Sequence, residues 1–312
     1  MAGETFHTLI ARNRRNSFIL IGGFMLFFVA MGLLIGMVWG GGDAAFSIGV
    51  ATVAGLIAFG LTLASYFGGS SALLGMSHAR EIVHADDPQL FNVVEEICIA
   101  GGMPVPRIYL INDTAMNAFA TGRNPQNASV AITVGLRAKL TRDELQGVMA
   151  HELSHIRNYD ILYAMLMAVM VGVLVMLCDI FLRSVFWGGA GRRRGSNRNS
   201  KGGGLQIVLM IVALILAIIA PILARIIQMS LSRQREYLAD AGSVELTRNP
   251  DGLIGALNKL GGDVEVLEVA NRATAGLYFV HPIKKFEKRA SSIFCTHPPI
   301  NDRVERLRQL SV

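Results

Sequence analysis

The residues best suited to chemistry are His151, Glu152 and His155, which form the pattern His-Glu-x-x-His. In a helix, positions four apart lie about 40° from one another around the axis and about 6 Å apart along it. Both imidazoles then point the same way and can bind one zinc ion, with Glu152 beside the metal to accept a proton from water. The pattern predicts metal-assisted hydrolysis; the alternative is two surface histidines on an amphipathic helix.

The residues before this motif indicate where its helix begins. Thr141 and Glu144 have the spacing of a capping box, in which each side chain accepts a hydrogen bond from the backbone N–H of the other residue. We therefore expect a helix that starts at Thr141 and runs through the 150s, which is the context that the motif needs.

A catalytic zinc ion usually has three protein ligands, so a third must come from another element. Glu236 is the preferred residue, because it lies on the first polar helical stretch after the last apolar run. Asp240 follows four residues later on the same face, where it can accept a hydrogen bond from a ligand histidine. Four other glutamates remain alternatives, and an ordinary solvated helix face fits the same spacing: Glu245, Glu265, Glu268 and Glu287.

Two long apolar runs near the N-terminus predict a membrane hairpin. Phe18–Trp39 and Phe46–Phe67 contain no charged residue, and only the turn-rich stretch 40–45 separates them. Each run reaches the roughly 20 residues that a helix needs to cross a bilayer. A secretory signal peptide is a poor explanation, because the first run is too long and a second follows at once.

Two further apolar runs, Ile161–Leu182 and Leu205–Ala224, are long enough to cross the membrane. They could instead form a buried or interfacial hairpin that does not cross. The loop 183–204 between them holds six basic residues and no acidic one, and the other 23 basic residues are balanced by 23 acidic ones. The net charge of +6 thus comes from one loop, and we expect no nucleic acid as partner.

The composition also indicates a membrane protein. Of the 312 residues 52% are hydrophobic and 17% charged, whereas soluble domains have about 25% charged residues. The apolar runs divide the chain into five parts: an N-terminal segment 1–17, a hairpin 18–67, a soluble part 78–160, a second hydrophobic pair 161–224, and a second soluble part 225–312.

The soluble part is predicted to be a mixed α+β domain. Apolar spacing predicts a helix over Pro88–Ala100, and short β-branched or aromatic runs predict strands at Arg107–Ile111 and Val130–Val134. Asn117–Gly122 is expected as an edge strand beside the last of these. The edge at Asn117, Ala118 and Phe119 can pair with an extended substrate, although an ordinary core sheet fits the same residues.

Four separated motifs, in their order along the chain, resemble the HtpX family of bacterial membrane-bound zinc endopeptidases: 117–122, 151–160, 235–240 and 296–299. This family is of the gluzincin group and is related to the eukaryotic CAAX prenyl endopeptidases. The resemblance implies a multi-pass α-helical membrane protein with a zincin protease domain, one Zn²⁺ per chain and Glu236 as the third ligand. It also implies stress-related quality control, with unfolded or damaged membrane proteins as substrates and the protease domain facing the cytosol.

The same resemblance draws attention to His297 and Arg303. His297 precedes two prolines, and Arg303 lies six residues later. In the related prenyl endopeptidases a histidine and an arginine with this offset lie at the active site. The resemblance therefore suggests that His297 and Arg303 contact substrate or developing negative charge; a surface loop histidine and a helix arginine are the alternative.

Two other functions compete with a quality-control protease. One is a protease for prenylated peptides. The other is a membrane scaffold or channel with a structural metal site, but three of the four apolar runs have no charged residue to line a pore.

The orientation is predicted from Arg12, Arg14 and Arg15, which precede the first run and favour a cytosolic N-terminus in the cell inner membrane. The first hairpin then returns the chain to the cytosol, where the metal helix lies. Whether 161–182 and 205–224 cross, which would place the basic loop outside, stays open.

Overall fold

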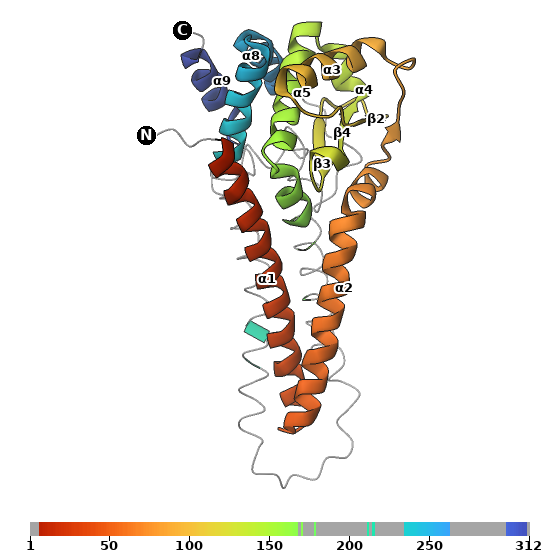
Figure 1. Ribbon diagram of the computed structural model, residues 1–312, viewed down its shortest axis with the longest axis vertical. Helices are drawn as coiled ribbons and strands as arrows, with labels where there is room; N and C mark the ends of the chain where they lie inside the picture. Colours follow the sequence, from red (N-terminus) through yellow and green to blue (C-terminus); the bar gives the residue numbers. More distant parts are fainter. Residues whose placement is uncertain are drawn as a thin grey trace. The chain divides into compact units, whose positions relative to one another are not determined.

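The computed structural model describes residues 6–167, 170, 178, 211, 214–215, 234–262 and 298–310 (Figure 1). The basic loop 183–204, and nearly all of the second hydrophobic pair beyond residue 167, lie outside the described residues. The chain divides into two compact units. One comprises 1–16, 66–168 and 227–312, and the other comprises 17–65 and 169–226.

The first two helices form a hairpin. Helix α1 (Phe6–Trp39) and helix α2 (Ala44–Met76) are joined by a turn in which the Asp43 carboxylate accepts hydrogen bonds from two backbone N–H groups of α2. The helices approach closely at two glycines of α1: a Cβ on Gly36 would lie 2.5 Å from the Cα of Ser47, and one on Gly32 would lie 2.8 Å from that of Ala51. Small residues four apart allow this kind of close packing between membrane helices.

Both helices are long and apolar enough to cross a membrane. The segments that meet this criterion are Ala11–Met37 and Ala44–Met76, and only 22% and 17% of their most apolar windows are buried. A core helix of a soluble protein would be mostly buried. Large apolar side chains such as Phe18, Leu26 and Leu56 are instead 66–73% exposed, which suits a lipid environment.

The other unit contains a four-stranded mixed sheet of order β1-β2-β4-β3. Its strands are β1 (Arg80–Glu81), β2 (Arg107–Ile111), β3 (Ala118–Gly122) and β4 (Ala128–Thr133). Strands β2 and β4 are parallel, the other neighbours are antiparallel, and β3 lies at one edge.

The predicted strand Arg107–Ile111 is confirmed, whereas β4 begins and ends earlier than the predicted Val130–Val134. The strand ends at Thr133 because the hydroxyl of Thr133 accepts a hydrogen bond from the Leu136 N–H and so caps helix α4 (Val134–Lys139). A short 3₁₀ turn, η1 (Pro125–Asn127), precedes β4.

The predicted helices of this unit are also present. Helix α3 (Pro88–Gly101) and helix α5 (Arg142–Arg157) pack together, and the capping box of Thr141 and Glu144 is confirmed. Helix α8 (Pro250–Gly262) packs on α5 and also contacts helix α9 (Ile300–Gln309) (Figure 1). Helix α5 is therefore buried along most of its length, and its polar residues 151, 152 and 154 face the interior.

Candidate active site

Helix α5 brings His151 and His155 onto one face. Their Nε2 atoms lie 3.2 Å apart, His151 is only 1% exposed, and one ring meets the other edge-on. Two ligands of a tetrahedral zinc ion at about 2.0–2.1 Å lie roughly 3.3 Å apart, so this spacing suits a single ion between them.

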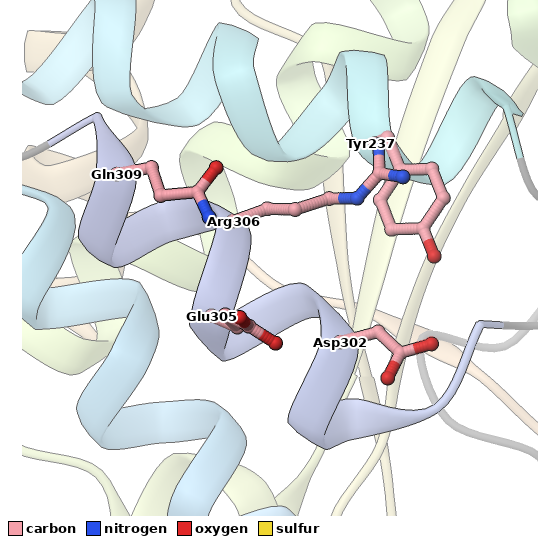
Figure 2. A pocket seen from close by; sticks show the side chains of 5 residues that line it. All are labelled: Tyr237, Asp302, Glu305, Arg306 and Gln309. Carbon is pink, nitrogen blue, oxygen red and sulfur yellow. The ribbon is translucent and has the colours of Figure 1, made fainter.

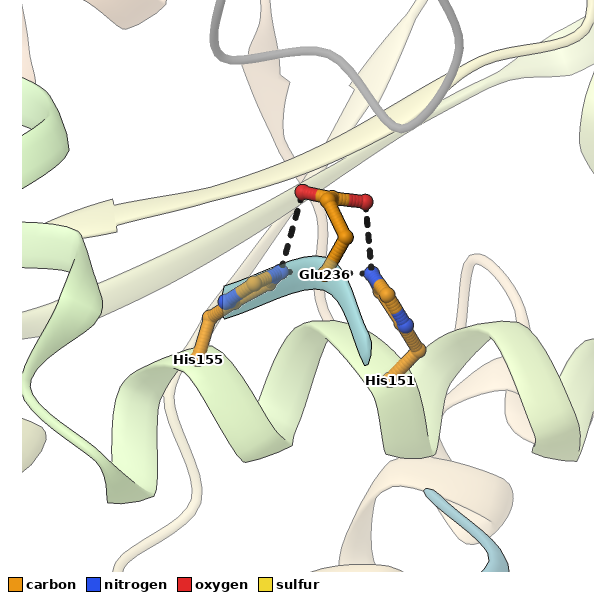
Figure 3. Close-up of side chains that lie close together, drawn as sticks. All are labelled: His151, His155 and Glu236. Carbon is orange, nitrogen blue, oxygen red and sulfur yellow. Dashed lines mark hydrogen bonds and ion pairs between the residues drawn. The ribbon is translucent and has the colours of Figure 1, made fainter. Parts of the chain in front are cut away.

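Glu236 comes from the helical segment 234–247 and points at both imidazoles (Figure 3). Its Oε2 lies 3.7 Å from Nε2 of His151, and its Oε1 lies 3.7 Å from Nε2 of His155. One atom from each residue lies within 4.8 Å of the others, so these three residues, hereafter the His/Glu cluster, could hold a metal ion. Two imidazoles and one carboxylate are a common donor set for catalytic zinc.

The electrostatics of the cluster favour a cation near His155. Burial lowers the pKa of His155, but the hydrogen bond to Asp160 and the neighbouring carboxylate charges, above all that of Glu236, raise it to about 9. Burial, together with the smaller effect of the Arg303 charge, lowers the pKa of His151 to about 4, although the hydrogen bond to Asp240 acts in the opposite direction. The carboxylates thus create a negative potential in a buried place that already contains nitrogen donors.

Asp240 and Arg303 contact His151 on the Nδ1 side of its ring, opposite the cluster. Oδ1 of Asp240 lies 2.9 Å from Nδ1 of His151, which leaves Nε2 to face the cluster. Arg303 contacts the same carboxylate with two nitrogens, Nη2 at 2.7 Å from Oδ1 and Nε at 3.0 Å from Oδ2. Burial raises the pKa of Asp240, but the charge of Arg303 and the contact with His151 outweigh it and keep the pKa below its ordinary value.

Arg303 was expected to contact substrate or developing negative charge, and the structure places it beside the His/Glu cluster. The side chain is 1% exposed, and besides Asp240 its Nη1 lies 3.5 Å from Oε2 of Glu236. It thus contacts residues of the cluster directly, and its contact with substrate stays a prediction. His297 lies outside the described residues.

The alternatives to Glu236 fall into two groups. Glu245 is partly exposed, and its Oε1 lies 3.0 Å from Nη2 of Arg157. It is not among the described residues that could share a metal ion with the two histidines. The other three, Glu265, Glu268 and Glu287, lie outside the described residues.

Helix α9 is attached to segment 234–247 at a second point. The guanidinium of Arg306 lies 3.7 Å from the ring centroid of Tyr237, in a polar surface hollow also lined by Asp302, Glu305 and Gln309 (Figure 2). Stacking of this kind contributes about 0.5–1 kcal/mol at exposed sites. It holds α9, and hence Arg303, against the segment that carries the third residue of the cluster.

Glu152 lies next to the cluster and is 3% exposed. Burial raises the pKa of Glu152 to about 7, and the charge of Glu236 acts in the same direction against the neighbouring positive charges. A carboxyl group with a pKa near neutrality can both accept and donate a proton during a reaction.

Strand β3, at an edge of the sheet, runs beside Glu152 and is buried along its whole length. Asn117 and Thr133 form a hydrogen-bonded pair across β3 and β4, with the Thr133 N–H donating to the Asn117 carbonyl at 3.0 Å. Main-chain groups alternate along an antiparallel strand, so those of Phe119 also face β4 while those of Ala118 and Ala120 face outward. The Ala120 amide in fact lies within hydrogen-bonding reach of the Glu152 carboxylate.

Asp160 was not singled out as a site residue, yet its carboxylate contacts Nδ1 of His155 as that of Asp240 contacts Nδ1 of His151. Its Oδ2 lies 3.2 Å from Nδ1 of His155, and it is 4% exposed. Asp160 lies after the end of α5, beyond the turn at 158–159, so helical spacing did not predict its contact with His155. Only its place in the resembling motif 151–160 marked it.

Comparison with known proteins agrees with these features. The model of peptidase family M48 matches residues 84–311. The protease HtpX homolog of Listeria monocytogenes serotype 4b (strain CLIP80459) is 43% identical over 305 residues, covering 96% of this chain and 98% of that protein. The protease HtpX homolog of Lactiplantibacillus plantarum is 40% identical over 302 residues, with the same coverage.

Among solved structures, the crystal structure of S. mikatae Ste24p matches with a TM-score of 0.49 and 18% identity, covering 95% of this chain and 67% of that one. The family match covers most of the chain, and the curated relatives align with nearly all of it. The chain therefore belongs to peptidase family M48, whose members are zinc-dependent metallopeptidases.

Proposed function

We propose that this protein is a membrane-bound endopeptidase that cleaves unfolded or damaged membrane proteins and holds one zinc ion per chain with His151, His155 and Glu236. The observation that carries the proposal is the buried His/Glu cluster with the Glu152 carboxylate beside it. A purely structural metal site would not need a neighbouring carboxyl group with a pKa raised to about 7.

The zinc ion, when bound, supplies a Lewis acid that polarises the scissile carbonyl and lowers the pKa of water. Glu152 takes the proton from the attacking water as the new C–O bond forms, and returns it to the amine as the C–N bond breaks. Asp240 and Asp160 keep the Nε2 atoms of His151 and His155 facing inward, since each carboxylate accepts a hydrogen bond from the Nδ1–H of its histidine.

The position of β3 at an edge of the sheet supports an extended peptide as substrate. A substrate strand that pairs with β3 would run directly past Glu152, because the Ala120 amide is within reach of that carboxylate. Pairing of this kind needs a segment with free main-chain groups, as unfolded chains and loops have. This supports damaged proteins as the substrate class.

We place the protein in the cell inner membrane with its active site in the cytosol. The exposed apolar surfaces of α1 and α2 support the membrane, and Arg12, Arg14 and Arg15 at the start of α1 support a cytosolic N-terminus. Residues 161–182 and 205–224 are proposed to cross as a second pair, between the protease parts 78–160 and 225–312.

The orientation can be tested with an impermeant thiol reagent in intact cells. Single cysteines at positions 3, 196 and 311 are placed in a background without the three native cysteines. Positions 3 and 311 should stay unlabelled until the cells are lysed, and labelling of position 196 supports a second pair that crosses. Labelling of position 311 in intact cells would contradict the cytosolic active site, and protection of position 196 would contradict the second crossing.

The activity is tested with the purified, detergent-solubilised protein, by metal analysis and casein cleavage. Glu152→Gln should keep about one zinc ion per chain and lose about 10²–10⁴-fold in cleavage rate, because only the general base is removed. Glu96→Gln is the matched control, since Glu96 is an exposed carboxylate paired with Arg142 on α5. Cleavage by Glu152→Gln at the wild-type rate would refute the mechanism, and competition by prenylated rather than unfolded peptides would refute the substrate class.

A further inference from the structure

The turn that follows α5 is held by the N-terminal part of α1. Asn158 and Tyr159 form this turn, and Tyr159 has a φ of 60°, which residues with a bulky side chain rarely adopt. The side-chain amide of Asn13 donates to the Asn158 carbonyl at 2.9 Å, and the guanidinium of Arg14 lies 4.5 Å from the ring centroid of Tyr159. Two adjacent residues of α1 thus stabilise an unfavourable backbone conformation.

Asn13 also bonds the carboxylate that faces His155. Its Nδ2 donates to Oδ1 of Asp160 at 2.7 Å, while Oδ2 of the same carboxylate lies 3.2 Å from Nδ1 of His155. A side-chain amide has two N–H donors, and Asn13 uses one on the carboxylate and one on the carbonyl of the turn. Asn13 and Asp160 are 5% and 4% exposed, so bulk water does not compete for these bonds.

Arg235 also lies near the Asp160 carboxylate, at a longer distance than Asn13. Nε of Arg235 lies 3.5 Å from Oδ1 of Asp160, and its guanidinium lies 3.9 Å from the ring centroid of Tyr163. The geometry therefore gives Asn13 the shorter contact, and it is the contact that fixes the rotation of the carboxylate about its Cβ–Cγ bond.

We propose that Asn13 is a positioning residue of the metal site, which ties Asp160 to the turn and so aims the second carboxylate oxygen at His155. The proposal rests on the function proposed above, since it concerns the residue that would bind zinc. With Nδ1 of His155 held by Asp160, Nε2 stays directed at the cluster. Without the amide, the carboxylate can rotate and His155 loses its fixed orientation.

Under this assignment, α1 supports the metal site in addition to forming a proposed membrane helix. Asn13 precedes by five positions the apolar run that begins at Phe18. The start of the proposed membrane helix is therefore a part of the support for a metal ligand, and the soluble residues 78–160 and 225–312 would lack this support by themselves.

The test measures zinc affinity by competition with a chelator, on the full-length protein in detergent. Asn13→Leu keeps the branching and the number of side-chain heavy atoms and removes both donors, and we expect zinc binding to weaken on the order of 10-fold. Asp160→Asn should weaken it by about 10–100-fold. Arg14→Ala is the matched control, because it removes a contact of the same helix with the same turn without touching Asp160, and its zinc affinity should stay within about twofold of wild type.

The decisive measurement combines the two changes. If Asn13 acts through Asp160, adding Asn13→Leu to Asp160→Asn should cause no further loss of zinc affinity, because residues that share one pathway are not additive. Independent, multiplying losses would overturn the proposal, as would an unchanged affinity in Asn13→Leu or an equal loss in Arg14→Ala.

Two further measurements keep the outcomes distinct. The unfolding midpoint of each metal-free variant separates weak zinc binding from a poorly folded protein, and Asn13→Ser, which keeps one donor, replaces Asn13→Leu if the latter does not fold. Asn13→Ser should show a smaller loss in the same direction, and wild-type affinity in it would overturn the proposal. A wild-type protein that binds no zinc would refute the proposed function itself.

Discussion

The contact between Arg303 and Asp240 should stabilise the folded protein far more than a surface ion pair does. Arg303→Met keeps an unbranched side chain of similar length but leaves the carboxylates of Asp240 and Glu236 buried without their cation. Removing one partner of a buried pair costs about 3–5 kcal/mol, because the remaining charge is neither solvated nor paired. At roughly 2–4 °C per kcal/mol for a domain of this size, the unfolding midpoint should fall by about 6–20 °C.

A surface pair in the same unit provides the control. Arg142 contacts Glu96 at 2.6 Å, shorter than the closest contact of Arg303 with Asp240, but both side chains of the surface pair are 47% exposed. Solvent screens such a pair, so Arg142→Met should cost less than about 1 kcal/mol. Distance alone would rank the two pairs in the opposite order, and the comparison therefore tests the role of burial.

The assay is thermal unfolding of the metal-free protein in detergent, so that loss of zinc does not contribute. Four proteins form a double-mutant cycle: wild type, Arg303→Met, Asp240→Asn and the double variant. The coupling should be about 2–3 kcal/mol, because the double variant leaves no uncompensated charge on Asp240. A coupling as small as that of the surface pair, or an Arg303→Met midpoint within about 2 °C of wild type, would refute the reasoning.

The same contact predicts a dependence on pH. Because the pKa of Asp240 is held below its ordinary value, the pair stabilises the folded state above that ordinary value and loses this contribution as the pH falls through the lowered pKa. Without the guanidinium, burial raises the pKa of Asp240. The folded variant then binds this proton more readily than the unfolded chain does, so the destabilisation caused by Arg303→Met should be largest near pH 8 and shrink as the pH falls. The difference between the unfolding midpoints of wild type and variant across pH 4–8 would show this.

Three other predictions follow from the same structure. Glu236→Ala should lower both zinc content and casein cleavage, whereas Asp240→Ala should cost only about 10–100-fold in zinc affinity; full zinc content in Glu236→Ala would move the third ligand elsewhere. Gly147→Ala should destabilise the protein by about 1–3 kcal/mol, since its Cβ would lie 2.5 Å from a backbone nitrogen of α8, while Gly75→Ala, with nothing within 4 Å, should be neutral or stabilising. Asp87→Ala removes the cap of α3 and a salt bridge to α4, and should lower the unfolding free energy by about 1–2 kcal/mol, an effect that vanishes in acid as the carboxyl is protonated.

Local patterns in the sequence were sufficient for several elements. The capping box at Thr141 and Glu144 defined the start of α5, because both hydrogen bonds involve residues three apart. Uninterrupted apolar runs revealed α1 and α2, and helical spacing placed His151 and His155 on one face. All of these depend on contacts within one or two turns of the chain, so neighbouring residues contain the necessary information.

The sequence alone could not decide how the site is supported. Glu236 was preferred over four other glutamates from its position and then from resemblance, but its approach to both histidines depends on how segment 234–247 packs on α5. Only resemblance marked Arg303, and its contact with Asp240 depends on the packing of α9.

Tertiary structure alone also placed Asn13 beside Asp160, 147 positions away in the sequence. It likewise determined that the main-chain groups of Ala118 and Ala120 point away from β4, because that alternation follows from the pairing of β3 with β4. Contacts of this range arise from the packing of the whole unit, and spacing along the chain does not encode them.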